Sequence, residues 1–222
     1  MGLLALFAVR ALFAATLLSG ITLAQAPVLV PLTSAESNAV NVALGRMLCV
    51  GLFCQPEDNG GCALAACSYL LGGPVCKTPY PTAMAYTEPD SEQNGDRSWT
   101  REGANAVVLD SGEFLENPAR FGSPDVAVAS AILAAVLTHE AYHASDEYVW
   151  DAEGPKTEQD RQRLLDGEIR ASNAELSFLT AVLNCASCFL GAGGAWTAEQ
   201  AEKIDKRRGD VEGVLRSLHN QR

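Results

Sequence analysis

The sequence predicts an α+β fold that is predominantly helical, with a short sheet and a disulfide-stapled N-terminal segment. From residue 124 onward, apolar and amphipathic stretches with capping residues are long enough to form helices. The run at 105–110, NAVVLD, has the composition of a strand and is followed by Ser-Gly. Five of the seven cysteines lie between residues 49 and 76, a spacing typical of a loop-rich segment held by disulfides.

Residues 1–24 have the composition of a secretory signal peptide. They are almost wholly apolar with Arg10 as the only charge, and cleavage after Ala24 follows a pair of small residues. Cleavage after Ala26 is a second option. An uncleaved membrane anchor is the alternative, because about 20 apolar residues span a bilayer, although Arg10 is costly there. We therefore expect a single exported domain, 25–222, secreted or periplasmic, with no stable membrane association after cleavage.

The overall charge excludes one large class of functions. The chain has 27 acidic and 16 basic residues, a net charge of −11. Proteins that bind nucleic acid need a basic surface to displace counterions from phosphates, so we expect no nucleic-acid partner. Apolar residues make up 48% of the chain and charged residues 19%, which excludes a disordered acidic chain.

The cysteines predict disulfides, because closely spaced cysteines in an oxidising compartment are usually bridged. Five form an N-terminal cluster and two lie far downstream: Cys49, Cys54, Cys62, Cys67 and Cys76, then Cys185 and Cys188. Because five is odd, either one clustered cysteine stays free or a bridge reaches the distal pair and ties the N-terminal segment to the C-terminal helices. Zinc bound by the distal Cys-x-x-Cys is the alternative, but no second pair stands at zinc-finger spacing.

The first half of the chain contains one clear helix signal. Thr33-x-x-Glu36 matches a capping box and predicts a helix over 35–48. Residues 77–103 are rich in Pro, Ser, Asp and Asn and predict mostly loop, with a possible short strand at 83–87.

A long helix is predicted over 124–147. Ser123 is the expected N-cap, Pro124 suits the first helical position, and Asp125 suits the positive end of the helix dipole. Residues 126–137 are apolar on all sides, which predicts a central buried helix.

Two further helices follow a Gly/Pro connection. Thr157 can cap a helix over 158–190, which ends at the glycine-rich run 191–194. Thr197-x-x-Gln200 is a second capping box and opens a charged helix to about residue 218. The segment 124–190 is thus expected to form a helix pair.

The central helix contains the motif His139-Glu140-Ala-Tyr-His143. Four residues apart on a helix, the two imidazoles lie on one face and can reach one zinc ion. Glu140 is then placed to take a proton from a zinc-activated water. Burying such groups unpaired costs several kcal/mol, and a metal removes that cost.

A catalytic zinc needs a third protein ligand. The extended H-E-x-x-H-x-x-G-x-x-H pattern is excluded, because Val149 and Asp146 stand where it needs His and Gly. His219 has no ligand spacing and is expected to be an exposed histidine. A helix that returns after the turn brings Glu168 opposite the two histidines, and Glu175, two turns on, is the alternative third ligand.

These residues resemble the gluzincin zinc metallopeptidases, the thermolysin-like group, in which HExxH on one helix is completed by a Glu from the next. The matching residues are His139, Glu140, His143 and Glu168, in a stretch from 126 to 189. The resemblance implies a minimal zincin-like catalytic domain. In it zinc is held by the two histidines and Glu168, and Glu140 is the general base for peptide hydrolysis.

The sequence differs from that family in the residues that follow the third ligand. An Asp often stands four residues later and orients a ligand histidine; here that position is Ser172, with Asn173 beside it. Either could accept a weaker hydrogen bond. Asp146 is either a similar partner or a solvated carboxylate. The strand at 105–110 resembles the edge strand that pairs with an extended substrate, or is a plain buried strand. No oxyanion partner can be chosen among Tyr142, Tyr148 and Arg170.

The sequence therefore favours an exported zinc metallopeptidase that acts on a peptide or protein. The alternative from another class is a secreted, disulfide-rich binding or scaffolding domain with a structural or vestigial zinc site. A third possibility is hydrolysis of another amide, such as a cell-wall peptide cross-link.

Overall fold

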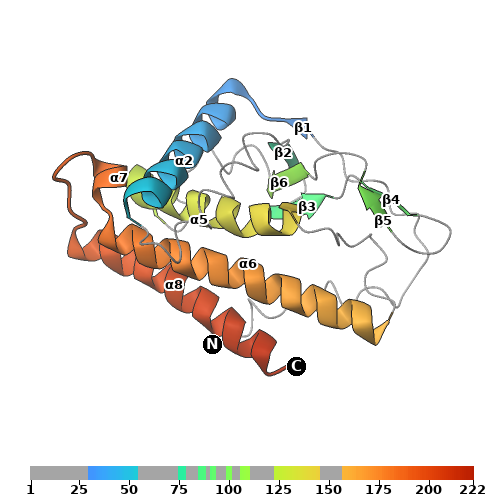
Figure 1. Ribbon diagram of the computed structural model, residues 1–222. Coiled ribbons are helices and arrows are strands. Elements are labelled where there is room, and N and C mark those ends of the chain that lie inside the picture. Colours follow the sequence, from blue (N-terminus) through green and yellow to red (C-terminus); the bar gives the residue numbers. More distant parts are fainter. Residues whose placement is uncertain are drawn as a thin grey trace.

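The computed structural model describes residues 30–54, 75–78, 85–88, 91–93, 99–101, 106–110, 123–145 and 157–222. The expected signal peptide and the middle of the cysteine-rich segment lie outside these residues. The described part is predominantly helical, as predicted (Figure 1). Its helices are α2 (Ser34–Phe53), α5 (Val126–Ser145), α6 (Glu158–Asn184), α7 (Ser187–Leu190) and α8 (Ala198–His219).

A four-stranded sheet lies at one end of the helices. It consists of β1 (Val30–Pro31), β2 (Val75–Thr78), β6 (Ala106–Asp110) and β3 (Ala85–Glu88), in that spatial order. β2 and β6 are parallel, whereas β1 and β3 each run antiparallel to their neighbours. A separate hairpin-like pair joins β4 (Ser91–Gln93) to β5 (Trp99–Arg101).

The position of β6 decides between the two alternatives for this strand. It is a buried strand and not an edge strand that pairs with substrate, because β6 lies between β2 and β3, and both its edges carry backbone hydrogen bonds. Its inward residues, Val107 and Leu109, are fully buried. Its β-branched, apolar composition therefore belongs to an internal strand.

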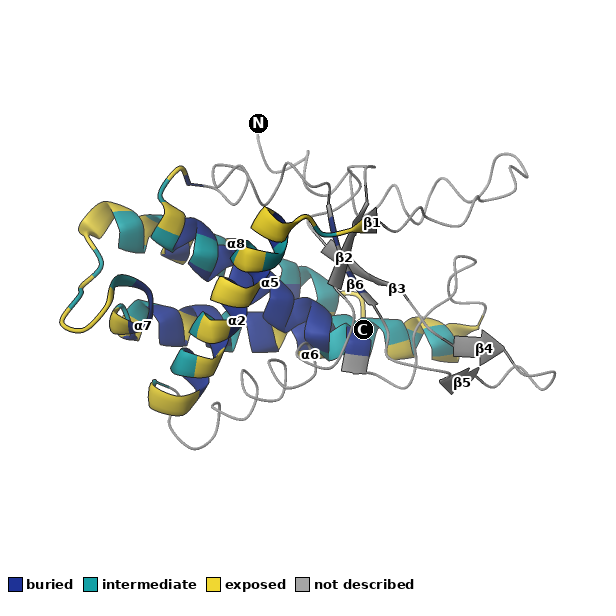
Figure 2. Ribbon diagram, turned by 90° about the horizontal axis from the view of Figure 1, so that it is seen from above, coloured by how far each residue is buried: buried dark blue, intermediate teal, exposed yellow. Residues whose placement is uncertain are grey.

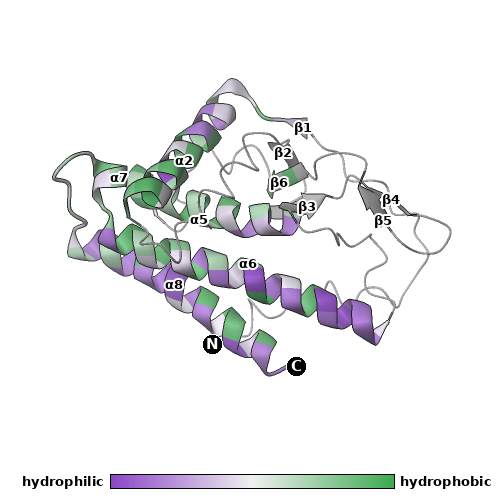
Figure 3. Cartoon of the chain, viewed as in Figure 1, coloured by the Kyte–Doolittle hydropathy of each residue, from purple (hydrophilic) through white to green (hydrophobic). Residues whose placement is uncertain are grey.

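Helix α5 is the centre of the fold, as its apolar sequence predicted. It contacts α2, α6, α7 and α8 as well as β3 and β6, and Figure 2 shows it as the most continuously buried helix. Val126–Ala144 is long and apolar enough to cross a membrane, but most of that stretch is buried inside the protein, as in the core helix of a soluble protein. By contrast, α6 and α8 present polar faces to solvent (Figure 3).

Three of the helix starts follow the predicted capping. Thr33 with Glu36 and Thr197 with Gln200 form complete capping boxes at α2 and α8. Thr157 caps α6, with Asp160 in the reciprocal position. Each arrangement satisfies backbone N–H groups that a helix start leaves without partners.

The cap of α5 differs from the expectation of Ser123. The helix begins at Val126, and the Asp125 carboxylate accepts from the N–H groups of Ala127 and Val128, at 2.9 and 3.2 Å. Ser123 instead accepts from the Asp125 N–H, at 3.1 Å. Asp125 also accepts from Gln200 of α8, and this bond leads the causes that lower the pKa of its carboxyl group. A charged cap that is shared with a second helix therefore replaces the local serine cap.

The predicted helix over 158–190 is broken at Cys185. α6 ends at Asn184, and the separate short helix α7 follows. Disulfides join Cys185 and Cys188 to α2: Cys54–Cys185 and Cys49–Cys188, with Cα–Cα distances of 5.8 and 5.7 Å, within the usual range for bridged cysteines. The short helix after the break packs against α2.

The disulfides confirm one of the two alternatives from the cysteine count, because bridges do reach the distal pair. Both bridges tie α2 to the end of α6 and to α7, and Arg46 of α2 donates to the Cys188 carbonyl beside them. Bridged pairs of this kind favour an oxidising compartment. Cys62 and Cys67 lie outside the described residues.

The two bridges should be partly redundant in stability. They close chain segments with sequence separations of 139 and 131 residues, but either bridge still holds the ends together when the other is absent. In the loop-entropy picture each single removal costs about 3 kcal/mol, whereas loss of the last bridge costs about 5 kcal/mol. The variant pairs are Cys49→Ser/Cys188→Ser and Cys54→Ser/Cys185→Ser, measured by guanidinium unfolding. The four-serine variant should lose more than the sum of the two pairs, and additive losses would contradict this redundancy.

Candidate metal centre

The HExxH residues occupy the last two turns of α5, where it packs against α6. His139 and Glu140 are only 5% and 8% exposed, and His143 is half-buried. The rest of the helix is apolar because it forms the core, so these polar side chains are surrounded by apolar residues in the interior. Buried polar groups need partners to offset lost hydration, and α6 supplies them.

Three side chains converge from the two helices. His139 Nε2 lies 3.1 Å from His143 Nε2. The carboxylate of Glu168 faces both rings: Oε1 is 3.5 Å from His143 Nε2, and Oε2 is 3.8 Å from His139 Nε2. One donor atom from each residue thus falls within 4.8 Å of the others, a group able to hold a metal ion.

Glu175 lies on the opposite side of the His139 ring. Its Oε2 is 3.1 Å from His139 Nδ1, within ion-pair distance, although the ring is not aligned for a hydrogen bond. Its other oxygen, Oε1, accepts from Arg207 of α8, at 2.8 Å from Nε and through a second contact with the guanidinium. Glu175 therefore supports His139 from behind and is already engaged by Arg207.

The charges at this position favour an ionised Glu175. The carboxyl is 2% exposed, and burial alone raises its pKa. The contacts with His139 and Arg207 outweigh burial and hold the pKa of Glu175 below its usual value. For His139 burial acts in the opposite direction and lowers the pKa. The contact with Glu175 and the negative charges of the three nearby glutamates outweigh burial, so the pKa of His139 is raised overall.

The two candidate third ligands therefore have different positions. Glu168 faces the Nε2 atoms, whereas Glu175 faces Nδ1. A proton on Nδ1 directed at Glu175 leaves the Nε2 lone pair of His139 free to bind a metal, the usual arrangement behind a metal-bound histidine. The structure thus separates the two carboxylates by the ring nitrogen of His139 that each faces, which helix periodicity alone could not do.

The residue that faces His139 from behind is Glu175 rather than Ser172 or Asn173. Asn173 donates from its side chain to the Ile169 carbonyl, at 2.8 Å, and Ser172 is buried in the helix interface. Glu175, two turns beyond Glu168, takes that position instead. The seven-residue spacing of the two glutamates was visible in the sequence, but the arginine that engages Glu175 lies 32 residues away on α8.

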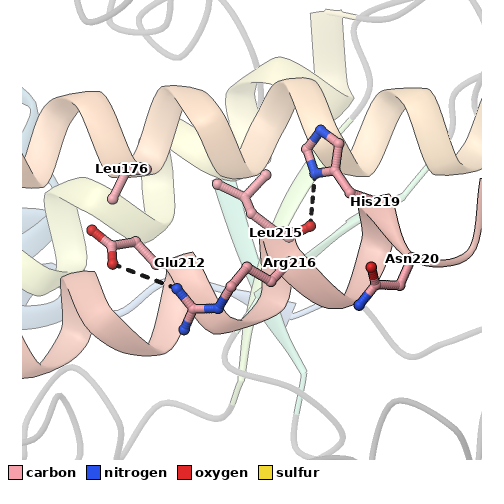
Figure 4. Close-up of a pocket in the computed structure, with 6 residues that line it drawn as sticks. All are labelled: Leu176, Glu212, Leu215, Arg216, His219 and Asn220. Carbon is pink, nitrogen blue, oxygen red and sulfur yellow. Dashed lines mark hydrogen bonds and ion pairs between the residues drawn. The ribbon is translucent and has the colours of Figure 1, made fainter.

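His219 lies apart from this group, as expected for an exposed histidine. It is at the end of α8, with Nδ1 2.8 Å from the Leu215 carbonyl oxygen. It is one of the six residues that line a pocket between α6 and α8, shown in Figure 4: Leu176, Glu212, Leu215, Arg216, His219 and Asn220. Asp146, Tyr148 and Val149 lie outside the described residues.

Comparison of the chain with protein-family models, curated proteins and solved structures finds no match.

The geometry predicts unequal effects of the two glutamates on metal binding. Glu168→Ala removes one of three donors, whereas Glu175→Ala keeps all three and loses only the support of His139. We expect Glu175→Ala to weaken Zn²⁺ binding about 10–100-fold and Glu168→Ala to weaken it further, measured by competition with a chromophoric chelator. Glu158→Ala, at the exposed start of α6, is the control and should bind as wild type. A greater loss for Glu175→Ala would reverse the assignment.

Proposed function

We propose that this chain is an exported, zinc-dependent peptidase. The observation that carries the proposal is the convergence of His139, His143 and Glu168, with Glu140 buried in the same turn of α5. Two imidazoles and one carboxylate form a donor set suited to catalytic zinc. The gluzincin resemblance seen in the sequence supports the same residues in the same roles.

The surroundings of the site suit a zinc ion with an open position. Among the described residues the donor group has three members, and Glu175, which faces the other nitrogen of His139, is held by Arg207. Three protein ligands are typical of catalytic zinc, whereas structural zinc usually has four. When bound there, zinc would supply Lewis acidity toward a substrate carbonyl and make water a stronger acid.

Glu140 is the proposed general base. It directly follows His139 in the chain, it is only 8% exposed, and it is close enough for its charge to raise the pKa of His139. A carboxylate there can accept the proton of the attacking water and return it to the leaving amine. Amide hydrolysis needs both transfers, because an amine leaves only after it is protonated.

Export is proposed from two independent features. The composition of residues 1–24 is that of a signal peptide, and the two disulfides favour an oxidising compartment. We infer a secreted or periplasmic enzyme whose partner is a peptide or protein substrate.

The central test is Glu140→Gln, which keeps the size of the side chain and removes the base. Zinc content should stay at the wild-type level, because Glu140 is not one of the three donors, while peptide hydrolysis should fall by about 10²–10⁴-fold, the range of general acid–base catalysis. The measurements are metal analysis and cleavage of an unstructured protein. Glu199→Gln, exposed on α8, is the matched control.

Three outcomes separate the alternatives. Full hydrolysis by Glu140→Gln would refute the mechanism. A wild-type protein that binds zinc but cleaves no amide would favour the binding or scaffolding domain. Cleavage of cell-wall stem peptides alone would identify the other kind of amide hydrolase.

A further inference from the structure

The C-terminal helix α8 reaches the metal centre through one side chain. Buried residues follow its inner face at Ile204, Val211 and Leu215. Arg207 lies on the same face, at helical spacing from Ile204 and Val211. Its guanidinium points into the interface with α6 and contacts Glu175 with two of its nitrogen atoms.

Glu175 depends on this contact for its position. A carboxylate that is 2% exposed must be paired to offset its lost hydration. The guanidinium occupies Oε1, so Oε2 remains directed at His139 Nδ1. Without Arg207, the buried charge of Glu175 would lose its main cationic partner. The carboxylate would then rotate away from His139, become protonated, or be hydrated by water entering the interface.

We propose that Arg207 is a positioning residue of the metal centre: it holds Glu175, and Glu175 holds the His139 ring with Nε2 toward the metal. The proposal rests on the zinc site inferred above and extends it to a third helix. A polar chain, Arg207–Glu175–His139, thus runs from α8 through α6 to α5. It makes α8 part of the zinc site although α8 contributes no zinc ligand.

The simpler explanation is that Arg207 only helps α8 to pack. The structure offers a way to separate the two, because α8 has a second polar contact with the core. Gln200 donates to Asp125 at the start of α5, at 2.8 Å. Gln200→Ala therefore weakens the docking of α8 and leaves the chain to His139 intact.

The test measures Zn²⁺ affinity by chelator competition in the full-length mature protein. Arg207→Met should weaken zinc binding about 10-fold, the low end of the range for residues behind metal ligands, because it acts one contact further out. Arg207→Lys should recover part of that loss, since it keeps the charge but not the forked donor geometry. Gln200→Ala and Arg216→Met, the latter an exposed cation of α8, should bind zinc as wild type does.

A double-mutant cycle tests whether Arg207 acts through Glu175. Glu175→Gln keeps the shape of the side chain and removes its charge. If the two residues form one chain, the double variant Glu175→Gln/Arg207→Met should lose no more affinity than Glu175→Gln alone. If the fold-losses in zinc affinity of the two single variants instead multiply in the double variant, Arg207 acts by another route and the proposal is overturned.

The remaining outcomes are distinct. Wild-type affinity in Arg207→Met, or equal losses in Arg207→Met and Gln200→Ala, would overturn the positioning role and leave the proposed peptidase untouched. A zinc-binding wild type with the expected Arg207 effects but no hydrolysis would overturn the peptidase and retain the positioning role. A wild type that binds no zinc would overturn both.

Discussion

The pairing of buried charge between α5 and α6 is the constraint on which the rest of the structure depends. An ionised carboxylate at the position of Glu175 is unfavourable in the interior unless a cation and a hydrogen-bond donor face it. His139 and Arg207 are those two groups, and they come from different helices. The interface therefore has few alternative registers: if α6 slid by one turn, about 5.4 Å, Glu175 would leave both partners and Glu168 would leave both histidines.

Local rules predicted most of the helical framework. Capping boxes at Thr33 and Thr197 marked helix starts correctly, because their hydrogen bonds involve residues only three positions apart. The uninterrupted apolar run in α5 predicted a central helix for an equally simple reason: every face of such a helix carries apolar side chains, and exposing any of them to water is unfavourable. The Ser123 cap was wrong because Asp125, two residues later, caps the helix instead, and a contact with Gln200, from 75 residues away, favours Asp125.

Non-local contacts explain what the sequence could not provide. The strand at β6 was recognisable from its residues, but its internal place in the sheet depends on β2 and β3 from earlier in the chain. At the site, HExxH spacing brought two imidazoles to one face, and helix periodicity limited the third donor to Glu168 or Glu175. Choosing between them required knowing which ring nitrogen each carboxylate faces, and that depends on the rotation of α6 about its axis and on Arg207.

The disulfides hold the C-terminal end of α6. Cys185 lies ten positions beyond Glu175, about 15 Å along the helix at 1.5 Å per residue, and is bonded to α2. α2 in turn packs on α5. At its C-terminal end α6 is thus bonded covalently to α2, which packs on α5, and further back along the helix it is joined to α5 by the polar chain through His139. A helix held at two separated points cannot readily slide or rotate against its neighbour. This fixed relation between α5 and α6 is what a metal site with donors from both helices requires, since its donors must keep their positions when the metal is absent.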